Sequence, residues 1–232
     1  MKFVSPLIPG TLVKKYRRFL VDVKLTTGKI VTAHCPTMGT MNGCCEPGSP
    51  VMLSDSNDPS RRNQLTWELV QVNNTWVGVN AAVPGKVLYE AIESRTLQGF
   101  TDFHEIQRDA SYGRGSKIAL MLHGMEQNCF INVYSVTWGE NGIALFPDAP
   151  SARIAKSVRE LAEIAGKGHR AVAFFFIQRS DCTIFKPAEQ IDRDFLKAIL
   201  AAQSGNVEIL VHRARITMEE ITLGDPLPYS LQ

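Results

Sequence analysis

The segment CFINVYSVTWG, residues 129–139, places two polar side chains on one face of a predicted strand. Side chains alternate along an extended chain, so Asn132 and Tyr134 point the same way. The segment SKIALML, residues 116–122, is predicted as another strand and offers only Ala119 at its centre. A metal-dependent hydrolase keeps charged groups on such strands. What these positions can do decides whether the protein is an enzyme.

A second candidate for chemistry is a zinc site made by His34, Cys35, Cys44 and Cys45, because thiolate and imidazole are the usual ligands of structural zinc. These residues form two adjacent pairs, and neighbours on an extended chain point to opposite sides. The spacing therefore favours packing within a loop, and we predict no metal site.

Basic residues gather in three stretches: the start of the chain, a polar loop near residue 60, and one side of a predicted helix, where they recur every three residues. Aromatic residues interleave with them, and Tyr16, Trp67 and Trp76 are candidates for stacking on bases. A solvated charged face and, for the tryptophans, a place in the core are the alternatives. The candidate nucleic-acid-binding residues are Lys14, Lys15, Arg17, Arg18, Arg61, Arg62, Arg153, Lys156 and Arg159.

Other catalytic signatures are missing from the sequence. There is no G-x-S-x-G elbow and no G-x-x-x-x-G-K-[ST] phosphate loop. The segment YGRGSK, residues 112–117, is glycine-rich and basic, which fits either a phosphate contact or a simple turn before a strand.

The first 80 residues have the pattern of a small β-barrel. Strands are predicted near residues 19–25, 29–33, 50–54, 65–72 and 75–80, separated by turn residues, with no convincing helix. Five short strands in about 70 residues suit an OB-like barrel, and an SH3-like barrel would look similar.

After residue 80 the periodicity changes to an α/β pattern. Apolar residues recur at helical spacing after Pro84 and in residues 151–168 and 192–205, and strands are predicted between and after these helices. RAVAFFFIQ, residues 170–178, is a continuous apolar run typical of a strand buried on both faces. We therefore predict an OB-like domain over residues 1–80 and a mixed α/β domain over residues 81–232, with helices flanking a mixed sheet.

Bulk composition predicts a soluble, cytoplasmic protein. No apolar run approaches the length that spans a bilayer, and Pro6, Pro9 and Gly10 interrupt any signal-peptide pattern. Five cysteines, an odd number, suit a reducing compartment better than a disulfide framework. The formal net charge of +2 neither demands nor excludes a nucleic-acid partner.

Several segments in order along nearly the whole chain make it resemble the sugar fermentation stimulation protein family. They include KYRRFLVDV, HCPTMG, MNGCCEPG, TWELV, YEAI, SVT, FPDA and VEIL. The resemblance implies an N-terminal OB-fold followed by a restriction-endonuclease-like domain of the PD-(D/E)XK type, and it implies DNA binding with suspected nuclease activity.

The nuclease motif that the resemblance implies is replaced in this chain. Ala119 stands in place of the family's aspartate, Asn132 in place of its glutamate and Tyr134 in place of its lysine. Phosphodiester hydrolysis needs carboxylates to hold a divalent cation, and these residues offer one neutral carbonyl oxygen between them. Glu105 and Asp148 remain as scattered acids. Outside this motif, Thr37, Met38, Gly85 and Ser157 also depart from the family pattern.

We therefore expect a protein that binds double-stranded DNA without sequence preference, with a degraded nuclease site and no cofactor. The alternative is a nuclease that uses Mg²⁺ or Mn²⁺ through Glu105, Asp148 and Asn132. A third interpretation is a purely structural or interaction role. We expect no membrane partner, and a homodimer stays open.

Overall fold

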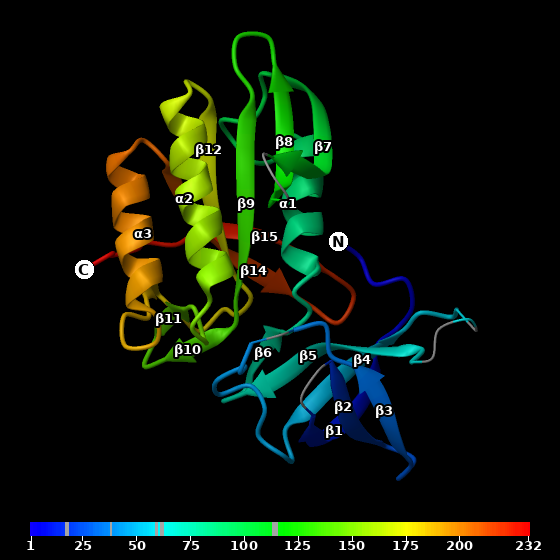
Figure 1. Ribbon diagram of the computed structural model, residues 1–232. Helices are drawn as coiled ribbons and strands as arrows, with labels where there is room; N and C mark the ends of the chain where they lie inside the picture. The colour runs from blue at the N-terminus through cyan, green and yellow to red at the C-terminus, as the bar shows by residue number, and fades with distance from the viewer. Residues whose placement is uncertain (17–18, 38, 59, 61–62, 113–115) are drawn as a thin grey trace.

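The N-terminal part of the chain is a closed β-barrel (Figure 1). The computed structural model describes residues 1–232 apart from 17–18, 38, 59, 61–62 and 113–115. The barrel strands are β1 (Ile8–Lys15), β2 (Leu20–Leu25), β3 (Ile30–His34), β4 (Pro50–Asp55) and β5 (Leu65–Val72). Their order is β3-β2-β1-β4-β5, and a parallel pairing of β3 with β5 closes the ring. This five-stranded closure confirms the OB-like prediction.

Two strands of this region differ from the sequence prediction. β1 is not among the predicted strands because Pro9 and Gly10 disfavour one, yet Gly10 is required there: a Cβ on it would collide with the Val23 side chain and the Lys24 carbonyl. β6 (Thr75–Gly78), predicted as the fifth strand, lies outside the closed ring as a hairpin partner of β5. The barrel therefore closes with β1, because close crossing of strands overrides local propensity.

The rest of the chain is a three-layer α/β domain. Its sheet has the order β15-β14-β12-β9-β8-β7. β9, β12 and β14 run parallel, whereas β7, β8 and β15 are antiparallel to their neighbours. The bounds are β7 Phe103–Tyr112, β8 Ser116–Gly124, β9 Cys129–Val136, β12 Arg170–Ile177, β14 Glu208–Ile216 and β15 Ile221–Pro226. The predicted mixed sheet with flanking helices is confirmed.

The helices cover both faces of this sheet (Figure 1). α2 (Ala152–Gly166) and α3 (Arg193–Ser204) pack on one face, and α1 (Val83–Glu93) packs on the other. The N-caps Ser151 and Asp192 accept hydrogen bonds from the amides of residues three positions on, which fixes where α2 and α3 begin. Between the two layers of helices lies β12, whose side chains are buried at every position after Arg170.

The α/β domain also has a small sheet, and a polar network joins the two domains. β10 (Trp138–Glu140), β11 (Ile143–Phe146) and β13 (Ile184–Pro187) form the small sheet below the main one. The Nε2 of Gln178, directly after β12, donates to Ser135 Oγ (2.8 Å) and Asn80 O (3.4 Å), while Gly78 N donates to Gln178 O (2.8 Å). Asn80 in turn donates to the buried carboxylate of Glu68 in β5 (2.9 Å). The barrel is thereby held in a fixed position against the sheet.

None of the helices among the described residues combines the length and the apolar character that a bilayer span requires.

Candidate functional site

Strands β8 and β9 separate beside Ala119 and Asn132. The strands pair from Leu122 opposite Cys129 to Leu120 opposite Ile131. The pairing stops one position before Ala119 would face Asn132. At that next position, Ala119 N donates to the side-chain oxygen of Asn132 (3.4 Å). The motif positions that the resemblance indicated are thus brought together at the point where the sheet splits.

The Asn132 side chain is committed to structural contacts. It is 7% exposed, its Oδ1 accepts from β8, and its Nδ2 donates to the backbone oxygen of Ser157 in α2 (3.4 Å). The amide therefore bridges strand and helix. An oxygen that already accepts an amide hydrogen and carries no charge is a weak ligand for a hard dication.

Tyr134 is a core residue. Its ring stacks on Phe175 with centroids 4.9 Å apart and tilts against Phe146 at 5.7 Å. Its hydroxyl lies 3.0 Å from Ser157 Oγ, which itself donates to Ile154 O (2.8 Å). Burial raises the pKa of Tyr134 above its ordinary value, so the phenol stays neutral. It cannot act as the cation or the base that a lysine would provide.

Three departures from the family pattern are mutual neighbours in space. Asn132, Tyr134 and Ser157 form one neutral, hydrogen-bonded cluster between β9 and α2. Since each side chain has a partner inside the cluster, no polar group is orphaned among these three residues.

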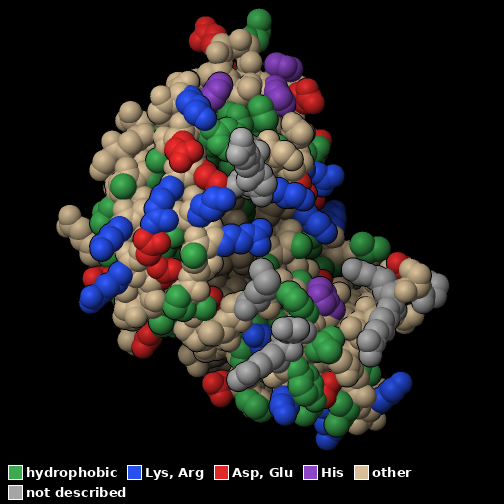
Figure 2. Space-filling view, viewed as in Figure 1, with side chains coloured by type: hydrophobic (Ala, Val, Ile, Leu, Met, Phe, Trp, Pro, Cys, Tyr) green, Lys and Arg blue, Asp and Glu red, His purple; other side chains and the backbone are tan. Residues whose placement is uncertain are grey.

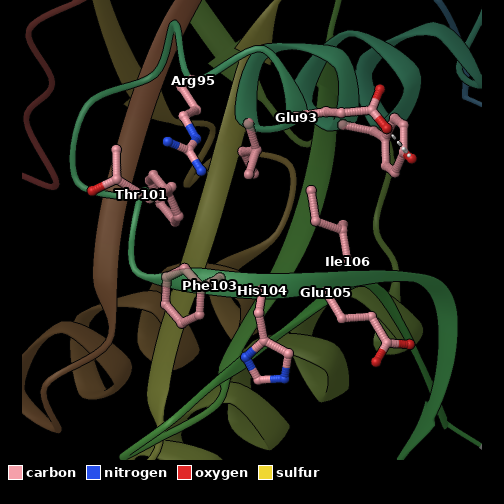
Figure 3. A pocket seen from close by; sticks show the side chains of 10 residues that line it. Glu93, Arg95, Thr101, Phe103, His104, Glu105 and Ile106 are labelled. Carbon is pink, nitrogen blue, oxygen red and sulfur yellow. Dashed lines mark hydrogen bonds between the residues drawn. The ribbon is translucent and has the colours of Figure 1, made fainter.

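Glu105 and Asp148 lie away from this cluster. Glu105 is on β7 in register with His123, which is four residues, or about 13 Å of strand, from Ala119. Figure 3 shows its carboxylate on the side of β7 away from α1. Asp148 is bound by the barrel, since its Oδ2 accepts from Met41 N (2.7 Å) and its backbone oxygen from Thr40 Oγ1 (2.6 Å). The structure does not assemble these acids with Asn132.

On the opposite face of the split, a cleft of about 650 Å³ opens beside Ala119. Its walls include Ala119 of β8, Val133 of β9, Gly85 and Lys86 in the first turns of α1, and Arg108 and Asp109 of β7. Lys86, Arg108 and Asp109 were not predicted as site residues from the sequence. A lone cation in an amphipathic helix or on an edge strand looks like a solvated position, so only Gly85, through its departure from the family pattern, gave a signal.

The predicted basic residues of α2 are all exposed, but they differ in their partners. Lys156 lies 3.5 Å from Glu160, and Arg159 forms an ion pair with Asp194 of α3. No ion pair of Arg153 with a described residue is found. Figure 2 shows Lys and Arg side chains in a band across the middle of the α/β domain, above a hollow that separates the band from the barrel.

The barrel contributes fewer described cations than predicted. Lys14 lies over the exposed ring of Tyr16, 5.1 Å from its centroid, while Lys15 donates to Gly39 O (2.9 Å) and holds a loop. The other barrel candidates, Arg17, Arg18, Arg61 and Arg62, lie outside the described residues, as does Met38.

The two tryptophans proposed as stacking platforms pack against the protein instead. Trp67 is fully buried and donates from Nε1 to Leu69 O, so it belongs to the core of the barrel. Trp76 of β6 is half-buried and packs against the apolar cluster that includes the inner face of α1. Of the three predicted aromatic contacts, Tyr16 alone has an exposed ring with a cation beside it.

The cysteines of the loop before β4 are buried or half-buried thiols. Burial raises the pKa of Cys35, that of Cys44 to about 12 and that of Cys45 to about 11. Cys44 donates to Thr137 O and Cys45 to Met41 O. Among the residues that the structure describes, no group of three or more His, Cys, Asp or Glu side chains is placed to hold a metal ion.

Comparison with known families matches both domains. The family model described as "SfsA N-terminal OB domain" matches residues 13–79, and the one described as "Sugar fermentation stimulation protein RE domain" matches residues 82–220. Proteins named "Sugar fermentation stimulation protein homolog" from Geotalea daltonii and Geobacter sulfurreducens are 42% and 44% identical to the chain. The first aligns over 100% of both chains and the second over 96% of both.

A solved structure has the same fold. "The structure of Pyrococcus Furiosus SfsA in complex with Ca2+" superposes with a TM-score of 0.90 over 99% of both chains, at 22% sequence identity. The likeness extends through the barrel and the α/β domain alike.

Proposed function

This chain belongs to the sugar fermentation stimulation protein family, and on that premise we propose that it binds double-stranded DNA without hydrolysing it. Binding works through exposed lysine and arginine side chains that contact backbone phosphates, so it is independent of base sequence. The described residues that would contact the phosphates are the cations of α2 and Lys14, which lies beside the exposed Tyr16. Among the α2 cations, Arg153 is the least neutralised by neighbouring acids.

One observation carries the absence of hydrolysis: the positions where the motif needs charge hold a neutral, internally satisfied cluster. Ala119 has no ligand atom, the Asn132 amide is used on both sides, and the buried Tyr134 phenol is neutral. A divalent ion loses tightly bound water on binding and needs negative ligands to offset that cost.

The Pyrococcus furiosus structure is described as a complex with Ca²⁺. In this chain Ala119, Asn132 and Tyr134 supply no negatively charged ligand for such an ion. The nuclease alternative also lacks support from the fold, since Asp148 is engaged by the barrel loop and Glu105 lies on the outer strand.

Binding is tested by titrating a labelled random duplex with the protein across a salt series in EDTA. We expect affinity to fall linearly on a log–log plot, with a slope of about −0.9 for each phosphate contacted. The double change Arg153→Glu and Lys156→Glu should weaken binding and make the slope shallower. Binding that is absent at low salt, or equal at low and high salt, would refute the proposal.

Hydrolysis is tested beside a reconstructed motif: Ala119→Asp, Asn132→Glu and Tyr134→Lys made together. The three are combined because a single lysine at 134 would leave a buried cation without a partner. We expect no cleavage by the unmodified chain in Mg²⁺ or Mn²⁺. Cleavage by the unmodified chain that EDTA abolishes would instead establish the nuclease alternative.

A further inference from the structure

We propose that the cleft beside Ala119 binds a phosphate group directly through Lys86 and Arg108, with no metal ion between protein and phosphate. This inference rests on the proposed DNA binding and deepens it, because it assigns one backbone phosphate of the nucleic acid to a specific place. It places that phosphate on the α1 side of the sheet, opposite the cluster of Asn132, Tyr134 and Ser157.

The two cations come from separate elements that the fold brings to one cleft. Lys86 projects from α1 and Arg108 from β7, and the cleft between them has a volume of about 650 Å³, within the range of small-ligand sites. Gly85 has no side chain, and nothing lies within 4 Å of where its Cβ would be, so this wall leaves open space. A phosphate group with its sugar has room to enter.

The charge on the cleft is positive. Its lining includes Lys86 and Arg108 against one acid, Asp109, and neither cation makes an ion pair with a described residue. Arg108 is oriented by the ring of Tyr89, whose centroid lies 4.9 Å from the guanidinium carbon. An oriented guanidinium loses less side-chain freedom when it binds phosphate.

The replaced motif explains why these cations can act alone. A carboxylate at position 119 would repel a phosphate unless a metal ion lay between them, but Ala119 adds no charge. Leu120 and Val133 add further apolar wall. These apolar side chains place no acid that would compete with an anion for the two cations. The cleft thus has the charge opposite to that of a metal-binding nuclease site.

The main experiment compares Lys86→Met with Arg108→Met, alone and together, and uses Lys29→Met as a charge-matched control on an exposed barrel turn. Duplex binding is measured across a salt series in EDTA. We expect the double variant to make the salt slope shallower by the one phosphate contact that is lost, which is about 0.9, while Lys29→Met changes it by less than about half a contact. Far-ultraviolet circular dichroism checks that the exposed replacements leave the fold intact.

A second measurement separates this inference from the proposed function. Inorganic phosphate is titrated into the metal-free unmodified protein while amide resonances are followed by NMR. We expect saturable shifts at Gly85, Lys86 and Ala119 that the double variant lacks. If DNA binds with an unchanged slope in the double variant and phosphate moves none of these amides, the cleft assignment is wrong while DNA binding stands. If the protein binds no DNA, the proposed function fails and the phosphate titration alone decides the cleft.

Discussion

The structure makes Tyr134 a packing residue, and this leads to a quantitative prediction. Tyr134→Phe removes one hydrogen bond, the 3.0 Å contact with Ser157 Oγ, and keeps the ring stacked on Phe175. Ser157 keeps its bond to Ile154 O (2.8 Å), so no buried hydroxyl is orphaned. The loss is therefore that of one neutral hydrogen bond, about 1 kcal/mol of the free energy of unfolding. For a chain of this size that lowers Tm by about 2–4 °C.

Tyr134→Ala provides the scale for this effect. It removes the whole ring from its contacts with Phe146 and Phe175 and leaves a cavity, so we expect a loss of about 3–5 kcal/mol of the free energy of unfolding. Both variants are unfolded with urea, and DNA binding is measured under native conditions. Ser157→Ala and the double variant Tyr134→Phe with Ser157→Ala complete a thermodynamic cycle, which isolates the interaction energy of the two hydroxyl groups.

The packing role of Tyr134 can be refuted by comparing stability with DNA affinity. If Tyr134→Phe leaves Tm unchanged but lowers DNA affinity tenfold or more, the phenol contacts the ligand and the cluster is a functional site. If stability falls while affinity stays within about twofold of the unmodified protein, the packing role is supported.

Two further predictions concern one contact between the domains and one buried ion pair. Gly39→Ala places a Cβ against the Asp148 carboxylate and should lower the free energy of unfolding in urea by about 1–2 kcal/mol. The control Gly166→Ala has open space around it in α2 and should be neutral or stabilise the protein by up to about 1 kcal/mol. Equal effects of the two changes would contradict the contact between Gly39 and Asp148. Asp181→Asn breaks the pair with the buried Arg179 and should cost about 2–3 kcal/mol at pH 7. The Arg179 hydrogen bonds lower the pKa of Asp181, so the pair stabilises the protein above about pH 4. The difference in the free energy of unfolding between the unmodified protein and Asp181→Asn should therefore shrink as pH falls below that value. A difference that is constant with pH would contradict the ion pair.

Local patterns in the sequence were sufficient for most elements of the fold. The helical spacing after Pro84 and in residues 151–168 and 192–205 corresponds to α1, α2 and α3, and the apolar run at residues 170–178 is the central strand β12. These features are local because side-chain periodicity follows from the geometry of a single helix or strand. The strand pattern of the first 80 residues predicted the OB-like barrel, and the order of family segments added the type of α/β domain.

The strand β1 could not be predicted in this way. Its Pro9 and Gly10 weaken any strand pattern, and the need for glycine arises only where Val23 and Lys24 of the neighbouring strand approach the backbone. Propensity describes an isolated segment, whereas barrel closure is a contact between segments.

The same limit applies to the candidate site. The sequence by itself determined that positions 119, 132 and 134 carry no charged side chain, because residue types need no coordinates. Only the tertiary structure decided what surrounds these positions: a neutral cluster with Ser157 on one face of the sheet, and Lys86 and Arg108 in a cleft on the other. The physical reason is that a side chain's charge is fixed by its chemistry, but its burial, partners and field depend on residues distant in the chain.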